Sequence, residues 1–211
     1  MPTLSEADSR ALVAKAGVPV SPYVTVSTAD DQIDLDFPLV AKLCGDAIAH
    51  KSERGLVRLN IKSKVELSDA ISELLDAASP ADGEVSVLVS SMIAGNRELI
   101  AGLATDPQFG PTVMLGLGGI LAEAVADVSF RLAPVSPTDA AEMIDELSSQ
   151  KLLGAFRGEP EVDRGVLIEL LVGLGELGTN SANIVSIDLN PLIICDGKPI
   201  AVDALVEIGD E

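Results

Sequence analysis

Residues near the carboxyl end of the chain predict a site for a hard cation. The segment IVSIDLNPLIICDGKPIAVDAL contains an Asp-Gly dipeptide at 196–197, which favours a two-residue hairpin turn. With that turn, Asn190 lies opposite Asp203, and Asp188 points to the same side by the period of two. Amide and carboxylate oxygens, with room for water and phosphate, suit Mg²⁺. A solvated sheet face would carry the same residues, and Pro191 could insert a bulge that shifts the register by one.

Other polar residues are candidates for contact with an anion. Lys42 lies inside the apolar run FPLVAKL, where a lysine is usually paired or bound to an anion because burying it alone is costly. In the stretch GLGGILA, backbone amides at Gly118 and Gly119 can approach an anion closely, although a tight turn needs no ligand. His50, the only histidine among 211 residues, precedes Lys51 in a polar loop that also fits an ordinary solvated turn.

Helices are expected at four places between these stretches. Thr3 and Glu6 fit a capping box, and Gly17 ends the helix that they open. The other three helices are predicted to begin near Ser63, Ser136 and Asp163.

Strands are expected in eight stretches: FPLVAKL, GLVRLNI, EVSVLVSS, RELIAGLATD, PTVMLG, SFRLAP, IVSIDLN and KPIAVDAL. Helix and strand alternate up to about residue 91; consecutive strands, two helices and a final pair of strands follow. This order indicates an α+β fold with a largely antiparallel sheet.

Composition excludes some classes of partner. The net charge of −19 repels nucleic acids and anionic membranes, and aromatic residues make up only 2% of the chain, too few for base-stacking platforms. No apolar run is long enough to span a membrane, and the first residues do not resemble a signal peptide. Two cysteines far apart in the sequence fit a reducing compartment, so a cytoplasmic protein is expected.

Four stretches, in this order and spacing, resemble the ATP-grasp β subunit of ADP-forming acetate–CoA (acyl-CoA) synthetases, relatives of succinyl-CoA synthetase. They are FPLVAKL, HKSERGLVRLN, RELIAGLATDPQFGPTVMLGLGGI and IDLNPLIICDGKPIAVDA. The resemblance covers almost the whole chain. It implies one ATP-grasp domain over residues 1–211, with two α+β subdomains at roughly 1–91 and 92–211 that enclose ATP or ADP with Mg²⁺.

The resemblance also implies roles for individual residues. Lys42 matches a phosphate-contacting lysine, Glu98 a carboxylate near the phosphates and metal, and His50 a histidine that takes the phosphoryl group. A neutral imidazole is a good nucleophile toward phosphorus, and Lys51 would offset the charge of the transferred group. The remaining expected contacts are Gly55, Gly118 and Gly119 with phosphate, the adenine hinge of Ser90, Ser91, Met92 and Ile93, and the Mg²⁺ ligands Asn190 and Asp203.

The implied activity is that of a nucleotide-binding β subunit in the reaction acyl-CoA + ADP + phosphate ⇌ acid + CoA + ATP. Such a subunit is expected to act only with a CoA-binding α subunit, in a heterotetramer. Two alternatives stay open: a β-like subunit of a succinate– or malate–CoA ligase, and a nucleotide-binding regulatory module without turnover. An intact set of Lys42, His50, Glu98, Asn190 and Asp203 weighs against the regulatory module.

Overall fold

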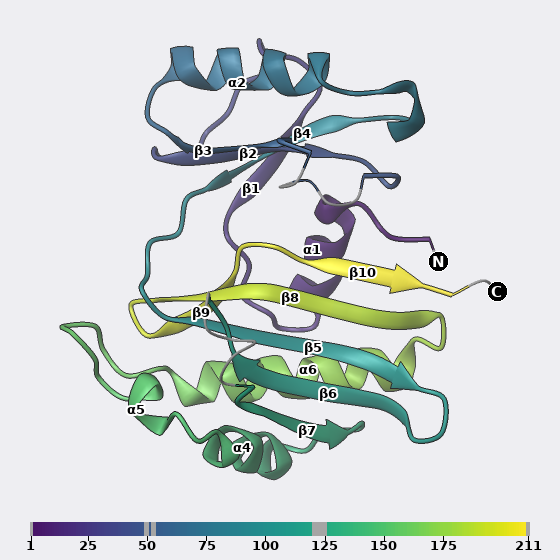
Figure 1. Ribbon diagram of the computed structural model, residues 1–211, viewed down its shortest axis with the longest axis vertical. Helices are drawn as coiled ribbons and strands as arrows, with labels where there is room; N and C mark the ends of the chain where they lie inside the picture. The colour runs from purple at the N-terminus through teal and green to yellow at the C-terminus, as the bar shows by residue number, and fades with distance from the viewer. Residues whose placement is uncertain (1, 49–50, 52–53, 120–125, 210–211) are drawn as a thin grey trace. The chain divides into compact units, whose positions relative to one another are not determined.

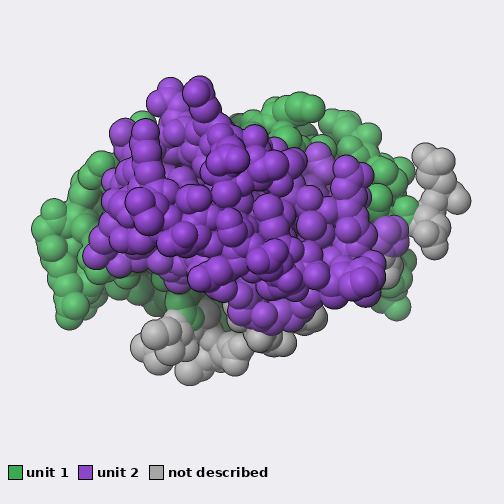
Figure 2. Space-filling model, turned by 90° about the horizontal axis from the view of Figure 1, so that it is seen from above, with its two compact units in different colours: residues 1, 9–20, 93–211 green, residues 2–8, 21–92 purple. Residues whose placement is uncertain are grey.

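The computed structural model describes residues 2–48, 51, 54–119 and 126–209. The chain divides into two compact units, coloured separately in Figure 2. We call residues 2–8 and 21–92 the N-terminal unit, and residues 9–20 and 93–211 the C-terminal unit.

The N-terminal unit is a four-stranded antiparallel sheet with helix α2 (Lys64–Asp76) on one face (Figure 1). The strands lie in the order β1 (Tyr23–Val26), β4 (Ser86–Ser91), β2 (Leu39–Cys44) and β3 (Val57–Ile61), and a short 3₁₀ turn η1 (Pro80–Asp82) precedes β4. Every residue of β2 is buried, as its apolar run predicts.

Helix α2 begins where the sequence predicts. The hydroxyl of Ser63 accepts a hydrogen bond from the backbone N–H of Glu66, and the Glu66 carboxylate accepts one from the N–H of Lys62. The buried face of the helix consists of Leu67, Ala70, Ile71 and Leu74, which recur at helical spacing. Each fully buried leucine or isoleucine contributes about 1.5–3 kcal/mol through burial, so this face holds the helix on the sheet.

The C-terminal unit is built on a six-stranded sheet. Its order is β10 (Leu205–Ile208), β8 (Ile184–Cys195), β5 (Glu98–Asp106), β6 (Gly110–Leu117) and β7 (Val128–Leu132), and β9 (Lys198–Ala201) pairs with β8 beside β10. All of these strand pairs are antiparallel. The predicted α+β fold with largely antiparallel sheets is confirmed.

Helices α4 (Pro137–Glu146) and α6 (Arg164–Asn180) pack on one face of this sheet, and the short α5 (Gln150–Leu153) lies between them in sequence (Figure 1). The covered face contains a cross-strand row of Val113, Leu103, Ile187 and Val206, all at most 2% exposed. The neighbouring row on the opposite face is Phe130, Met114, Gly102, Asp188 and Leu205. Asp188 therefore belongs to the face that these helices leave uncovered.

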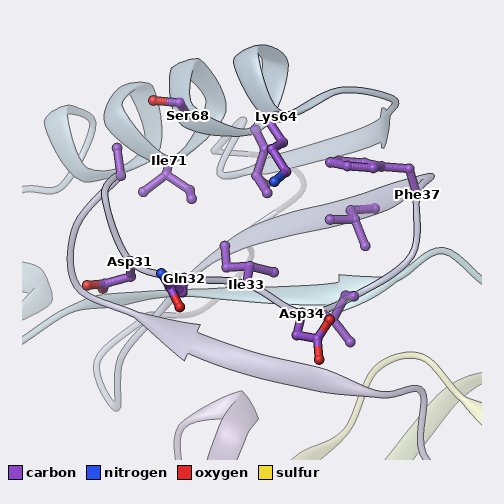
Figure 3. A pocket seen from close by; sticks show the side chains of 12 residues that line it. Asp31, Gln32, Ile33, Asp34, Phe37, Lys64, Ser68 and Ile71 are labelled. Atoms are coloured by element: carbon purple, nitrogen blue, oxygen red, sulfur yellow. The ribbon is translucent and has the colours of Figure 1, made fainter.

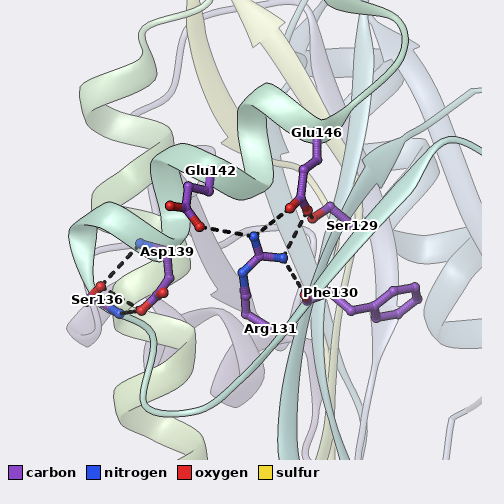
Figure 4. A network of polar contacts seen from close by, with 7 residues as sticks. All are labelled: Ser129, Phe130, Arg131, Ser136, Asp139, Glu142 and Glu146. Carbon is purple, nitrogen blue, oxygen red and sulfur yellow. Dashed lines mark hydrogen bonds and ion pairs between the residues drawn. The ribbon is translucent and has the colours of Figure 1, made fainter.

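An ion-pair network fixes the edge strand β7 to α4 (Figure 4). The guanidinium of Arg131 contacts the Glu146 carboxylate at 2.6 Å, and the Ser129 hydroxyl donates to the same carboxylate at 2.7 Å. These donors lower the pKa of Glu146 to about 2. Because Ser129 and Arg131 point to α4, Phe130 lies on the opposite face, where it is 54% exposed.

Helix α1 (Glu6–Lys15) corrects one sequence prediction. Gly17 ends the helix with φ of +90° and donates its N–H to the carbonyl of Ala14, as expected. The predicted capping box of Thr3 and Glu6 is wrong: the Ser5 hydroxyl caps the helix by accepting the N–H of Asp8 at 3.1 Å. Thr3 instead donates its hydroxyl to the carbonyl of Asp46. Glu6 is thus not needed for capping.

Candidate functional site

Glu6, Lys42 and Lys51, which we call the lysine cluster, lie together in the N-terminal unit. Lys42 occupies the middle of β2, where it pairs with Leu88 on one side and Val57 on the other. Its ammonium group contacts Oε1 of Glu6 at 2.8 Å, and the ammonium group of Lys51 contacts Oε2 of Glu6 at 2.6 Å. The buried Lys42 is therefore paired, as its apolar run predicts.

The sequence did not identify Glu6 as a member of this cluster. The apolar run around Lys42 indicates that an anion must lie nearby, but the chain has 33 acidic residues from which to supply it. Glu6 is 36 residues away from Lys42 and 45 from Lys51. The signal available in the sequence was the position of Glu6 at the start of a predicted helix, where a capping role explains a glutamate equally well.

The loop after Lys51 returns directly to the sheet. The N–H of Leu56 donates to the carbonyl of Lys51 at 2.8 Å, and the N–H of Leu43 donates to the carbonyl of Leu56. Gly55 has φ of +67° and open space where a Cβ would lie, so backbone at this point is accessible to a ligand. His50 lies outside the described residues, and its role stays a prediction.

The expected adenine hinge lies at the end of β4. Ser90 pairs with Val40 and with Tyr23, and Ser91 pairs with Leu39. The N–H of Met92 donates to the carbonyl of Pro38. Met92 is the last residue of the N-terminal unit and Ile93 the first of the following segment of the C-terminal unit. Met92 is 38% exposed, so its side chain is accessible to a ligand.

In the C-terminal unit, Glu98 lies against Gly118 and Gly119, which we call the glycine loop. The N–H of Gly118 donates to the carbonyl of Glu98 at 2.8 Å. A Cβ on Gly118 would lie 3.1 Å from the Glu98 side chain, and one on Gly119, which has φ of +83°, would lie 3.7 Å from Oε2 of Glu98. A carboxylate so close to the loop repels a phosphate. A cation between them would remove that repulsion.

The predicted hairpin forms with the expected register. Cys195 pairs with Lys198 and Leu192 with Ala201, and beyond the segment 202–204 Asp188 pairs with Leu205. The same register therefore holds on both sides of Asn190 and Asp203, which places them at the same level. The shift anticipated at Pro191 occurs on the other edge of β8: Leu99 pairs with Leu192, but Ala101 pairs with Leu189.

Asp188 lies two residues before Asn190 on the same side of β8. Desolvation by the surrounding protein, reinforced by the carboxylate of Asp203, raises the pKa of Asp188 above its ordinary value. We call Asp188, Asn190 and Asp203 the acidic cluster. Within the described part of the chain no group of three or more histidine, cysteine, aspartate or glutamate side chains is placed to hold a metal ion. The acidic cluster offers two carboxylates and an amide, and oxygen ligands of this kind suit Mg²⁺.

A cavity of about 590 Å³ in the N-terminal unit contains none of the expected site residues (Figure 3). The loop that follows β1 forms one wall, with Ile33 and Phe37, and α2 forms another, with Lys64, Ser68 and Ile71. The cavity is thus distinct from the lysine cluster.

Comparison with known proteins assigns the class. The profile of the ATP-grasp domain family matches residues 2–208, so the chain belongs to the ATP-grasp family. Within it, the chain is 36% identical over 208 residues to the β subunit of acetate–CoA ligase [ADP-forming] I from Pyrococcus furiosus. The match covers 95% of this chain and 90% of that subunit, which places the chain among the β subunits of the ADP-forming acetate–CoA ligases.

Two other relatives show the context in which such a domain occurs. Acetate–CoA ligase [ADP-forming] I from Archaeoglobus fulgidus is 34% identical over 202 residues, and the chain spans 29% of its length. A structure of acetyl-coenzyme A synthetase 1 from Ca. Korarchaeum cryptofilum, with coenzyme A and Mg-AMPPCP, matches with a TM-score of 0.84 and 36% identity over 98% of this chain and 93% of that one. Its phosphohistidine segment is described as pointing towards the nucleotide-binding site.

These relatives include a separate β subunit and a longer single chain, which supports a CoA-binding partner domain or subunit for this protein. In the described residues, no helix is long and apolar enough to cross a lipid bilayer.

Proposed function

We propose that this chain is the nucleotide-binding β subunit of an ADP-forming acyl-CoA synthetase and transfers a phosphoryl group between His50 and ADP. The observation that carries the proposal is the acidic cluster, two neighbouring carboxylates and an amide on a sheet face that the helices leave uncovered, in a chain that matches a β subunit along almost its full length. The net reaction is acyl-CoA + ADP + phosphate ⇌ acid + CoA + ATP.

The residues of the acidic cluster fit a divalent cation. Desolvation and the neighbouring carboxylate of Asp203 raise the pKa of Asp188, and a cation beside these groups would offset both effects. Mg²⁺ bound there, by Asn190 and Asp203 with Asp188 beside them, would neutralise phosphate oxygens of the nucleotide. Glu98, next to the glycine loop, is the further carboxylate that we assign to the phosphate and metal region.

The chain's own cations act on the phosphoryl group. In the proposed step the bond between a ring nitrogen of phosphorylated His50 and phosphorus breaks, and an oxygen of the β-phosphate of ADP forms a new bond to phosphorus. The nitrogen keeps the bonding electrons and the ring takes up one proton, which restores the neutral imidazole. Lys42 and Lys51 stabilise the charge on the transferred oxygens, and the open backbone at Gly55 allows the phosphoryl group to approach.

The remaining expected contacts complete the proposed nucleotide site. We assign the adenine to the hinge of Ser90, Ser91, Met92 and Ile93, and phosphate to the turn at Gly118 and Gly119. The N-terminal and C-terminal units are proposed to be the two subdomains of one ATP-grasp domain. We further propose assembly with a CoA-binding α subunit into a heterotetramer in the cytoplasm, which size measurement of the co-purified subunits and cell fractionation would test.

The test is His50→Asn, assayed with the partner subunit, acyl-CoA, phosphate and Mg-ADP. A residue that carries the phosphoryl group covalently cannot be replaced, so ATP formation should be almost abolished while Mg-ADP binding survives. A residue that only contacts phosphate would cost roughly 10²- to 10³-fold. ATP formation within tenfold of the native rate would remove His50 from the mechanism.

Mass spectrometry gives an independent check. The native chain, treated with Mg-ATP, should carry an acid-labile and base-stable phosphate on the peptide around His50. A phosphate found only on other residues would contradict the assignment.

A further inference from the structure

Glu6 connects the two lysines of the lysine cluster, and the proposed mechanism gives it no role. Its side chain is fully buried, at 0% exposure, in the first turn of α1. Each of its two carboxylate oxygens accepts from a different lysine, Lys42 at 2.8 Å and Lys51 at 2.6 Å. The two lysine side chains are themselves only 9% and 16% exposed.

This arrangement connects a loop residue to a rigid strand. Lys42 is held by the ladders of β2 on both sides. Lys51 belongs to a loop, and within the described residues its ammonium group contacts only Glu6. A carboxylate is planar and rigid, so binding one ammonium group on each oxygen fixes the direction and spacing of both. Through Glu6, the ammonium group of Lys51 is therefore held in a fixed position relative to Lys42 on β2.

The charges of the cluster also suit an anion. The cluster places two ammonium groups on one carboxylate, in a region where little solvent screens their charges. Without Glu6, two like charges would be buried side by side and would separate. With it, both ammonium groups stay together and can contact the same phosphoryl group.

We propose that Glu6 is a positioning residue for phosphoryl transfer: it holds the ammonium groups of Lys42 and Lys51 in the geometry in which both contact the transferred phosphoryl group. This inference rests on the proposed function. The alternative is that Glu6 only neutralises two lysines and stabilises the fold. The two differ in what Glu6 does to the rate of the folded enzyme.

The first test is Glu6→Gln in the enzyme assembled with its partner subunit. Gln keeps the shape but binds at most one lysine by its oxygen, so Lys51 loses its position. A misplacement of about 1 Å can cost roughly 10²-fold in rate, so kcat for ATP formation should fall by about that factor. KM for Mg-ADP should stay within about threefold, because the positive charge near the phosphates is not reduced. Glu6→Asp, which keeps the charge on a shorter side chain, should recover part of kcat.

Asp82→Asn is the matched control. Asp82 has a buried carboxylate in the same unit. Its two oxygens each accept a hydrogen bond of 2.8 Å from a terminal nitrogen of Arg54. Its loss should lower the melting temperature, as Glu6→Gln does, but leave kcat unchanged at a temperature where the enzyme is folded. An unchanged kcat in Glu6→Gln, or an equal loss in Asp82→Asn, would overturn the positioning role.

A double-mutant cycle with Lys51→Met shows whether Glu6 acts through Lys51. If it does, adding Glu6→Gln to Lys51→Met should change kcat much less than Glu6→Gln alone. Additive losses would contradict the proposal.

If the native complex forms no ATP at all, the proposed function fails, and Glu6 is judged separately by the crystal structure of Glu6→Gln. Lys51 should then have left its place beside Lys42, and a Lys51 that stays there would overturn the inference.

Discussion

The lysine cluster and the acidic cluster differ in the charges that they bring together: oppositely charged groups in the first, and two carboxyl groups in the second. In the lysine cluster the protein supplies its own counter-ion: Glu6 binds both ammonium groups at 2.8 and 2.6 Å. In the acidic cluster the pKa of Asp188 is raised by desolvation and by the neighbouring carboxylate of Asp203. The lysine cluster has its counter-ion within the protein, while we propose that a cation completes the acidic cluster.

The difference has a physical reason. A buried ammonium group without a partner is costly, so lysines in a fully buried strand need an internal carboxylate. Asp188 lies on a sheet face that the helices leave uncovered, where a carboxyl group can bind a proton or, as we propose, help to bind a metal. Substitutions that change charge should therefore have opposite consequences in the two regions.

The largest effect is expected for Lys42→Met. Methionine fills similar space, and Glu6 keeps Lys51 as a partner, so the fold should survive. Loss of one preorganised charge on the phosphoryl group should lower the rate of ATP formation about 10²- to 10³-fold. Steady-state assay of the complex measures this, with Lys64→Met, an exposed lysine of the same unit, as the control. Equal rates for Lys42→Met and the native chain would separate the lysine cluster from the chemistry.

Asp203→Ala should have the next largest effect, on metal-dependent binding. Even an outer-shell partner of a metal is worth about 10- to 100-fold in affinity, so removing a direct ligand should weaken Mg-ADP binding at least about tenfold. Titration calorimetry measures the affinity. Asp196→Asn, at the turn of the same hairpin with φ of +48°, is the control, because asparagine tolerates that conformation. Native affinity in Asp203→Ala would exclude Asp203 from the site.

Asp188→Asn tests whether the carboxylates of Asp188 and Asp203 repel each other. Without Mg²⁺, removing one of two like charges should raise the melting temperature, by up to about 4 °C for about 1 kcal/mol in a chain of this size. With Mg²⁺ the order should reverse, because the native chain gains more from the metal than the variant does. Thermal unfolding with and without Mg²⁺ decides this, and a variant less stable than the native chain under both conditions would contradict a repulsive carboxylate pair.

The smallest effect concerns pH. The folded chain holds the proton of Asp188 more tightly than the unfolded chain, so this group adds stability as pH falls through its raised pKa. Glu146 has the opposite sign: its pKa is lowered from 4.5 to about 2, so its contribution is present above about pH 4.5 and is lost as pH falls toward 2.

Denaturant unfolding from neutral pH to pH 2 should therefore show opposite pH slopes for these two groups. Asp188→Asn should remove the gain on acidification, and Glu146→Gln the loss. Because the Glu146 side chain is 50% exposed, that change should be small, and Glu146→Gln should not alter Mg-ADP binding. Profiles that both variants share with the native chain would show that neither group is shifted in solution.

The strands and the C-terminal hairpin could be predicted because their signals are local. The Asp-Gly turn at 196–197 fixes which residues oppose each other within a few positions on either side, and the same register continues from Cys195–Lys198 to Ser186–Glu207. The apolar run of β2 likewise predicted that Lys42 is buried and paired. Capping of α2 by Ser63 followed from two residues three positions apart.

Contacts between distant parts of the chain were decided only by the tertiary structure. The sequence determined that Lys42 needs a partner, but only the tertiary contacts of Glu6 decided that this residue supplies a carboxylate and that Lys51 shares it. Likewise, alternation placed Asp188 on the same side as Asn190, but only the spatial approach of the 202–204 segment coupled its charge to Asp203. Local pattern specifies which side of a strand or helix a residue occupies, whereas the partner across a long loop depends on how whole elements pack, which no short-range spacing encodes.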